Sequence, residues 1–311
     1  MTHDELGAHL PPCVSVVVPT RQRPELLSRA LISILDQRYD GDIEVLVVFD
    51  QEEPADPGVD VTEGRSIVLL RNERRAGLAG ARNTGILAAK GDYVAHCDDD
   101  DAWLPDKLAK QIEAARRWPE AEVVVTGVTV VYQDRAIDRV PSRDMGLRDL
   151  LRSRAQEIHP SSILVDRATC IEGIGLVDEA LPGSYGEDYE WLLRAARRGP
   201  IRVVSEPLVR VLWHRSSFFA DRWATIIEAI QYLIAKYPEF EREPEGLARL
   251  YGRLAFANAA IGDRVEARRW ARRTLRLNVR ERRAYLALVV SLGLVSADSL
   301  MRLAHRTGRG I

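Results

Sequence analysis

The sequence predicts an α/β fold with a mostly parallel central sheet flanked by helices, followed by an all-helical C-terminal tail. Continuously apolar runs recur through roughly the first hundred residues, which is typical of strands buried on both faces of a parallel sheet. Helical patterns separate these runs, as the crossovers between parallel strands require. From about Phe218 onward only helical spacing remains.

The N-terminal part alternates strand and helix. Val14–Val18 is an apolar run that Pro19 ends, and Pro24–Gln37 follows with apolar residues at helical spacing. Proline in the first turn of a helix is well tolerated because the N–H it lacks has no helical partner there. The same patterns predict strands at Ile43–Phe49, Ser66–Leu70 and Tyr93–Cys97, helices at Ala79–Ala89 and Pro105–Trp118, and a strand pair or one long bent strand over Glu122–Tyr132.

Helices dominate the rest of the chain. A single hairpin of the tetratricopeptide type around Gly262-Asp263 cannot form a solenoid, so we expect a packed helical tail. This divides the chain into one domain over residues 1–217 and a helical region over 218–311. The predicted helices are Tyr189–Arg198, Arg222–Tyr237, Pro244–Ala260, Val265–Leu277 and Arg282–Leu294.

Composition narrows the class of protein. The chain has 311 residues, 46% of them hydrophobic, enough for one large core with a helical appendage. A net charge of −2 gives no reason to expect nucleic acid as a partner. Cys13, Cys97 and Cys170 are far apart in the sequence, which favours a reducing compartment over disulfides or a cysteine zinc site.

No segment is predicted to enter a membrane. The first residues carry Asp4 and Glu5 and lack the basic start and apolar run of a signal peptide. The apolar stretch Ala284–Ala297 is shorter than the roughly 20 residues that cross a bilayer. We therefore expect a cytoplasmic protein, with a peripheral position at the inner face of the plasma membrane left open.

Four adjacent aspartates, Asp98–Asp101, follow the fourth predicted strand. Ligands bind beyond the carboxyl ends of parallel strands, where Pro19-Thr20-Arg21, Asp50 and Arg71-Asn72 also lie. Neighbouring carboxylates repel one another unless a cation or hydrogen-bond donors compensate, and Mg²⁺ and Mn²⁺ prefer oxygen ligands. A metal–diphosphate site is predicted, the alternative being a solvated loop in which Asp101 or Asp106 caps the next helix.

Several motifs occur in a characteristic order. The first three are VSVVVPTRQRPELLSRALISILDQ, VLVVFDQ and GLAGARNTGILAAKGDYVAHCDDDDAWLPDKL, and the later ones are HPSSILVDRATCIEGIGLVDEAL, GEDYEWLLRAARRG and VRVLWHRSS. Together they resemble family 2 inverting glycosyltransferases of the GT-A fold. The resemblance implies a nucleotide-binding half at about residues 13–108 and an acceptor half at about 109–217.

The resemblance also implies an activity. It is metal-dependent transfer, with inversion, of a sugar from a nucleotide-diphosphate donor, expected to be a UDP-sugar, and it uses Mn²⁺ or Mg²⁺. The acceptor would be a hydroxyl of a glycan, of a lipid-linked or cell-surface polysaccharide precursor, or of a secondary metabolite.

Residues that match the family's nucleotide site take their roles from the resemblance. Asp50 would accept a hydrogen bond from uracil, although Phe49 and Gln51-Glu52 replace the family's usual neighbours in that turn. Asp99 would lie near the ribose. The other implied nucleotide contacts are Pro19, Thr20, Arg21, Arg82, Asn83 and Asp98.

The metal and diphosphate ligands are likewise implied by the resemblance. Asp98 and Asp100 match the family's Asp-x-Asp motif, with Asp100 as the direct metal ligand. His214 would complete the metal shell or touch the diphosphate, and Arg215 would add positive charge beside it.

Inverting transfer needs a carboxylate that removes the proton of the acceptor hydroxyl. Glu187 and Asp188 follow the turn Gly183–Gly186 and open a predicted helix, where free N–H groups stabilise an ionised carboxylate. Ordinary helix capping would use the same residue types. The resemblance implies that Asp188 is the catalytic base and that Glu187 orients it or contacts the acceptor.

Arginines are concentrated in the helical tail. Nine of them stand against Glu266 and Glu281 between Arg264 and Arg283, a local charge of +7. Such asymmetry can mark an anionic partner, and a membrane surface would suit a lipid-linked acceptor. A solvated helix face with its apolar side packed inward is the commoner explanation. Aromatic residues are not interleaved for base stacking, so no nucleic acid is expected.

Other functions fit less well. A nucleotidyltransferase usually has a glycine-rich, lysine-containing loop after the first strand, and PTRQRPELL has no glycine there. A dinucleotide-binding dehydrogenase would need G-x-G-x-x-G after Val18. A sugar-nucleotide-binding protein without turnover stays open as the alternative.

Overall fold

The computed structural model describes residues 11–132, 135–154, 157–213 and 222–306. Its centre is a nine-stranded sheet with the strand order β3-β2-β1-β4-β8-β6-β9-β5, and β7 pairs with β6. The strands are β1 (Val14–Thr20), β2 (Ile43–Phe49), β3 (Arg65–Arg71), β4 (Tyr93–His96), β5 (Ala102–Trp103), β6 (Val123–Tyr132), β7 (Arg135–Arg139), β8 (Ile163–Asp166) and β9 (Arg202–Leu212).

Most of these strands run in one direction. The β3-β2-β1-β4 unit is parallel throughout. β8 is antiparallel to both β4 and β6, and β9 is parallel to β6, so β6 and β9 point the same way as β1. Among the described strands, only β5, β7 and β8 run in the opposite direction. The prediction of a mostly parallel sheet is therefore confirmed.

Helices cover both faces of the sheet because successive strand residues point to opposite faces. Val16 and Val18 of β1 face one core, and Val17 faces the other. The first core lies under α1 (Pro24–Leu35) and α3 (Lys107–Arg117), and the second under α2 (Leu78–Ala88), α4 (Leu147–Arg152) and α5 (Glu187–Arg198). Short helical turns complete this part of the chain: η1 (Pro160–Ser162), η2 (Thr169–Ile174) and η3 (Pro182–Ser184).

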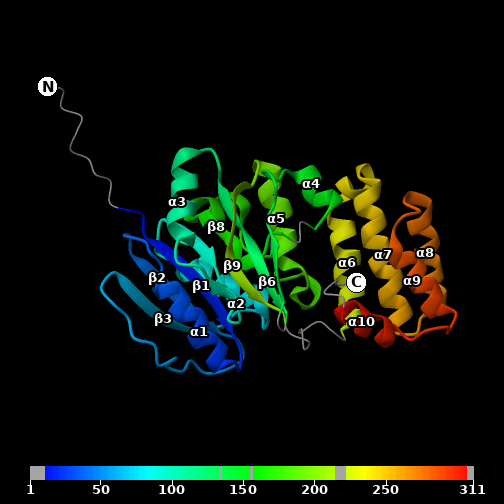
Figure 1. Cartoon of the computed structure of the whole chain (residues 1–311), viewed down its shortest axis with the longest axis horizontal. Coiled ribbons are helices and arrows are strands. Elements are labelled where there is room, and N and C mark those ends of the chain that lie inside the picture. The colour runs from blue at the N-terminus through cyan, green and yellow to red at the C-terminus, as the bar shows by residue number, and fades with distance from the viewer. Residues whose placement is uncertain (1–10, 133–134, 155–156, 214–221, 307–311) are drawn as a thin grey trace.

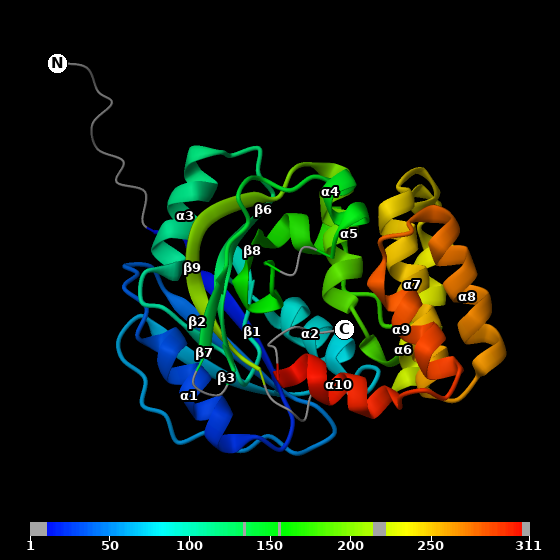
Figure 2. The same cartoon turned by 45° about the vertical axis from the view of Figure 1, so that its right-hand side comes forward.

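The tail is helical, as predicted, and lies to one side of the sheet (Figure 1). It comprises α6 (Trp223–Lys236), η4 (Pro238–Arg242), α7 (Pro244–Ala260), α8 (Arg264–Leu277), α9 (Arg282–Ser291) and α10 (Ala297–Arg306). α7, α8 and α9 stand side by side, whereas α10 runs across their direction (Figures 1 and 2).

The tail shares its core with the sheet domain. Ile230 of α6 and Leu254 of α7 belong to the same apolar cluster as Leu193 of α5. Farther out, α7, α8 and α9 pack through small alanine side chains, including Ala267 and Ala284. α6 and α7 thus contribute to the core of the sheet domain. The predicted boundary at 217/218 stays a prediction.

The membrane prediction can be compared with the helices. Within the residues that the structure describes, no helix combines the length and the apolar character needed to cross a bilayer. The stretch Ala284–Ala297 forms most of α9 and the turn that follows it.

Candidate active site

The carboxyl ends of β1 and β4 meet through a buried side-chain contact. Thr20 donates a hydrogen bond of 2.8 Å to Asp99, and Arg23 donates to Asp99 at 3.2 Å and to Asp100 at 2.9 Å. Burial raises the pKa of Asp99 even though Thr20 and Arg23 oppose the shift. Burial and the charges of Asp98, Asp101 and Asp99 raise the pKa of Asp100 to about 7. We call Asp98–Asp101 the aspartate turn. Its carboxylates need additional positive charge nearby to stay ionised.

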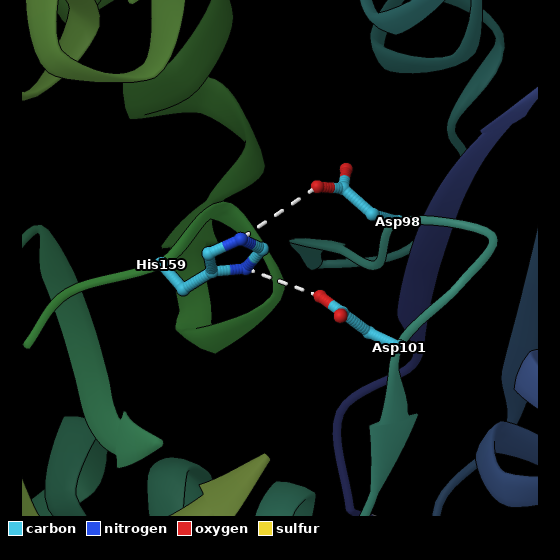
Figure 3. Close-up of side chains that lie close together, drawn as sticks. All are labelled: Asp98, Asp101 and His159. Atoms are coloured by element: carbon cyan, nitrogen blue, oxygen red, sulfur yellow. Dashed lines mark ion pairs between the residues drawn. The ribbon is translucent and has the colours of Figure 1, made fainter. Parts of the chain in front are cut away.

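His159 supplies part of that charge and joins two of the aspartates. Its Nδ1 lies 3.1 Å from Asp101 and its Nε2 lies 3.9 Å from Asp98 (Figure 3). Burial alone would lower the pKa of His159, but the Asp101 carboxylate raises it to about 9. Ser161 ties the same turn together, because it donates to Asp101 at 2.5 Å and accepts from the Asp98 amide at 2.9 Å.

These three residues fit a divalent metal ion. One ligand atom from each of Asp98, Asp101 and His159 lies within 4.8 Å of the others. Asp101 Oδ1 is buried and has no hydrogen-bond partner among the residues that the structure describes, so one oxygen is available as a ligand. Two carboxylates with one imidazole make a donor set that a divalent ion can use.

The metal ligands predicted from the sequence, Asp100 and His214, are not the residues of this group. Asp100 is not part of this group, and its carboxylate is paired with Arg23. His214 and Arg215 lie outside the described residues. The role of Asp100 as the direct ligand stays a prediction, and the sequence did not point to His159 or Asp101 as ligands.

Arg82 connects the aspartate turn to the predicted base. This buried side chain of α2 forms an ion pair of 2.6 Å with Asp98 and a second one with Glu187. Burial would lower the pKa of Arg82, but Asp98 and Glu187 raise it instead. Burial raises the pKa of Glu187 in spite of the Arg82 charge. One guanidinium group thus brings together Asp98 and Glu187, which lie 16 and 105 positions from Arg82 in the sequence.

Asp188 is the second residue of α5, which begins directly after Gly186. Gly186 has a left-handed backbone with φ of 78°, a conformation that glycine adopts without the steric penalty of a side chain. The N-cap residue Gly186 has no side chain that could cap α5. Glu187 and Asp188 stand in the first turn, where free backbone N–H groups stabilise an ionised carboxylate. Asp188 keeps 13% of its side chain exposed and lies 3.3 Å from Arg154. It can therefore reach a ligand.

Asp50 is held by several donors at the end of β2. It accepts hydrogen bonds from Asn72 at 2.7 Å, from the Gly77 amide at 3.0 and 3.1 Å, and from Gln51 at 2.9 Å. Burial would raise its pKa, but these hydrogen bonds lower it. Since Gln51 already bonds one carboxylate oxygen, a uracil ring would have to compete with that amide.

The other predicted nucleotide contacts have different surroundings. Pro19 is buried in β1, and Arg21 is exposed just after it. Asn83 exchanges hydrogen bonds of 2.8 Å with the backbone of Val177 and donates to Glu179 at 2.7 Å. Asn83 therefore braces the loop before α5, and its role as a nucleotide contact stays a prediction.

Relatives of known class share this sequence pattern. Residues 15–168 match the family model described as Glycosyl transferase family 2. A protein from Haemophilus influenzae described as an uncharacterized glycosyltransferase is 27% identical over 72% of this chain and 76% of its own length. The Escherichia coli glucosyltransferase WfgD, described as acting on alpha-D-GlcNAc-diphosphoundecaprenol with UDP-Glc, is 36% identical over 32% of this chain and 39% of its own length.

Solved structures show the same fold. TarS from S. aureus, solved in complex with UDP-GlcNAc, has a TM-score of 0.60 at 17% identity, with 95% of this chain and 92% of that chain covered. The mannosyltransferase PcManGT from Pyrobaculum calidifontis, in complex with GDP-Man and Mn²⁺, has a TM-score of 0.54 at 20% identity, with 96% and 80% covered.

The sheet, its flanking helices and these neighbours define a GT-A type glycosyltransferase fold. The chain belongs to glycosyltransferase family 2 and is an enzyme of that class. The first curated relatives are matched over 34% to 76% of their own length.

Proposed function

We propose that the chain transfers a sugar, with inversion, from a UDP-sugar to a hydroxyl group of a carbohydrate or lipid-linked acceptor, and that it uses Mn²⁺ or Mg²⁺. The observation that carries this proposal is the double ion pair of Arg82, because it holds the aspartate turn and the Glu187-Asp188 pair together. Donor site and base must be adjacent for a direct displacement.

The names of similar proteins support the choice of donor. WfgD is described as using UDP-Glc, and TarS was solved with UDP-GlcNAc. PcManGT was solved with GDP-Man and Mn²⁺. A UDP-sugar with a divalent ion is therefore the donor that we propose, and a GDP-sugar is the competing donor.

Each part of the site has a task in this proposal. Thr20 and Asp99 contact the nucleoside beyond β1 and β4, and Asp50 accepts from the base. Asp188 takes the proton from the acceptor hydroxyl as that oxygen attacks the anomeric carbon, so no covalent enzyme intermediate forms. A divalent ion bound at the aspartate turn would neutralise charge on the departing diphosphate.

Release of nucleoside diphosphate tests this function. The purified chain is incubated with a panel of UDP- and GDP-sugars, with Mn²⁺, with Mg²⁺ or with EDTA. We expect UDP release from one of the UDP-sugars with a metal present, and loss of that release with EDTA. Donor binding without release from any sugar nucleotide, with acceptors supplied, would instead indicate a binding protein without turnover.

We also propose that the tail contacts an anionic membrane surface. Arg269, Arg272 and Arg276 are exposed along one face of α8, and Ala267 and Ala271 of the same helix are buried. The tail also has exposed apolar side chains, with Val265 of α8 at 77% exposure and Leu294 of the α9–α10 turn at 70%. Arginines beside exposed apolar residues favour binding to the interface of a membrane with anionic lipids.

Charge removal on α8 should weaken this contact. Each arginine near an anionic bilayer contributes about 1 kcal/mol, so Arg272→Gln/Arg276→Gln should reduce affinity for anionic vesicles about thirtyfold. Co-sedimentation with phosphatidylglycerol vesicles measures the change. Arg29→Gln/Arg38→Gln removes the same charge from exposed positions in α1 and in the segment that follows it, and should have little effect. Equal binding by both variants would contradict a specific role for α8.

A further inference from the structure

Four arginines from separate segments gather beside the N-terminus of α5. They are Arg154 after α4, Arg249 and Arg253 one turn apart on α7, and Arg283 in the first turn of α9. Their positive charges lie close enough to repel one another, and burial together with this repulsion lowers the pKa of Arg249 and of Arg253. We call this set the arginine cluster. It lies where the helical tail meets the acceptor half.

Tyrosines of the acceptor half line the cluster. Arg253 donates a hydrogen bond to the Tyr185 hydroxyl, and Arg249 donates to the Tyr189 hydroxyl at 3.1 Å. The Arg154 and Arg253 guanidinium groups lie 5.9 and 5.5 Å from the centre of the Tyr185 ring. Such rings attract cations, but they do not neutralise them.

The cluster has more positive than negative charge. Arg154 is paired with Asp188 at 3.3 Å, and Arg283 with Glu281 at 2.9 Å. Within the described part of the chain, Arg249 and Arg253 have no carboxylate partner. Two guanidinium charges are thus uncompensated in a region of low exposure, which is unfavourable unless an anion is bound there.

Unused hydrogen-bond donors in the cluster also indicate a bound anion. The Nε atoms of Arg249 and Arg283 are buried, and no described residue forms a hydrogen bond with them. Burial and then the neighbouring arginines lower the pKa of Arg253 to about 10, with the tyrosine opposing the shift. Buried polar atoms in native proteins nearly always have partners, so donors and charge in excess at one place indicate a ligand.

The backbone holds the cluster in place. α7 packs so closely on α4 that a Cβ atom on Gly246 would lie 1.9 Å from the Leu151 carbonyl oxygen. Only glycine permits this approach, and it fixes the α7 face that carries Arg249 and Arg253. Arginines on a fixed helix lose little conformational freedom when they bind a ligand.

We propose that the arginine cluster binds a phosphoryl group of the acceptor, either a phosphate ester or a diphosphate. This inference rests on the proposed transferase function and names the chemistry of its acceptor. The guanidinium fork matches the oxygens of phosphate, and a group with about two negative charges would balance the two uncompensated arginines.

The position of the cluster assigns it to the acceptor and not to the donor. Arg154 belongs to the cluster and is paired with Asp188, so an anion bound there would lie beside the proposed base. The proposed donor site, the aspartate turn, has its own cations, Arg23 and His159. Arg82 connects this turn, through Asp98, with Glu187. A phosphoryl group in the cluster would therefore hold the acceptor while its hydroxyl approaches Asp188.

Binding of pyrophosphate to the full chain tests the site without any catalysis. Saturating UDP is added so that the donor site is filled, and pyrophosphate is titrated by calorimetry in metal-free buffer. We expect Arg249→Gln/Arg253→Gln to lose about a hundredfold in pyrophosphate affinity, with UDP affinity unchanged. Arg242→Gln/Arg264→Gln, at exposed positions flanking α7, is the matched control and should bind pyrophosphate as the natural chain does.

Folding defects and the source of the phosphoryl group are tested separately. Arg249→Lys/Arg253→Lys keeps the charge and should recover part of the pyrophosphate affinity. In transfer assays, two acceptors with the same sugar are compared, one an octyl glycoside and one an octyl diphosphate ester. The Gln variant should raise KM for the diphosphate ester much more than KM for the octyl glycoside.

Two results would overturn the inference. One is equal pyrophosphate affinity in the natural chain and the Gln variant, and the other is a parallel loss of UDP affinity, which would assign the arginines to the donor. Failure of the transferase proposal would be seen separately, as absence of UDP release, because the pyrophosphate titration does not depend on turnover.

Discussion

Asp188→Asn is expected to slow sugar transfer about a thousandfold while donor affinity stays within twofold of the natural chain. An asparagine side chain has nearly the same shape and can still accept a hydrogen bond from Arg154, but it cannot take a proton from the acceptor hydroxyl. General-base catalysis contributes about 10² to 10⁴ in rate. Initial rates at saturating donor and acceptor, with UDP affinity from calorimetry, measure the two quantities.

Glu187→Gln is the informative comparison for this prediction. Glu187 is buried and ion-paired with Arg82, so its loss leaves a guanidinium charge only partly compensated by Asp98. Removal of one partner from a buried pair destabilises a protein markedly. We expect a larger fall in Tm for Glu187→Gln than for Asp188→Asn, because Arg82 keeps only 3% of its side chain exposed whereas Arg154, the partner of Asp188, keeps 31%. If Asp188→Asn keeps more than a tenth of the natural rate, another group removes the proton.

The first half of the fold could be predicted because its strands carry their own signal. Ile43–Phe49 is buried on both faces and forms β2 with the predicted bounds. Most other strands and helices of this half end within two residues of their predicted limits. Local apolar runs are sufficient where a strand lies in the middle of a parallel sheet.

The second half of the sheet has weaker local signals. β9 is only partly buried and contains Glu206 and Pro207, which interrupt an apolar run, while β8 has four residues and β5 has two. Of the two forms predicted for Glu122–Tyr132, a strand pair or one long bent strand, the structure has the single strand, with a register shift at Thr126–Gly127. These strands form because neighbouring strands pair with them, and their own residue pattern does not reveal them.

The candidate site was predictable only in part for the same reason. The aspartates stand out in the sequence because four of them adjoin a strong strand. His159 joins them because β8 pairs antiparallel with β4 and brings the preceding turn beside Asp98. A lone histidine 58 positions from Asp101 gives no local indication of that contact. The ion pairs of Arg82 likewise depend on how α2 and α5 pack, which spacing does not reveal.

Two sets of metal ligands have been described: the sequence predicts Asp100 with His214, and the structure brings together Asp98, Asp101 and His159. Substitution of Asp101 distinguishes between them. We expect Asp101→Asn to weaken Mn²⁺ affinity about a hundredfold and to slow transfer about a thousandfold. A lost carboxylate ligand removes charge from the ion's shell, and neutralisation of the diphosphate by the ion is worth several kcal/mol. Titration of Mn²⁺ in the presence of UDP measures the affinity directly.

Asp106→Asn is the matched control, because Asp106 lies five positions away, is 45% exposed at its side chain and forms an ion pair with Arg38 at 3.7 Å. It should bind Mn²⁺ as the natural chain does. Asp100→Asn then decides between the two ligand sets. A larger loss of affinity in Asp100→Asn than in Asp101→Asn would favour the ligand predicted from sequence over the group formed with His159.

The pH dependence of Mn²⁺ affinity gives an independent measure of the same choice. An imidazole must lose its proton before it can bind an ion, and the pKa of His159 is raised to about 9. Affinity should therefore rise with pH, by about tenfold per unit between pH 7 and 8. If Asp100, with a pKa of about 7, is the ligand and His159 is not, the rise should level off above pH 7. In His159→Gln the steep rise above pH 7 should disappear, because no imidazole proton remains to be displaced.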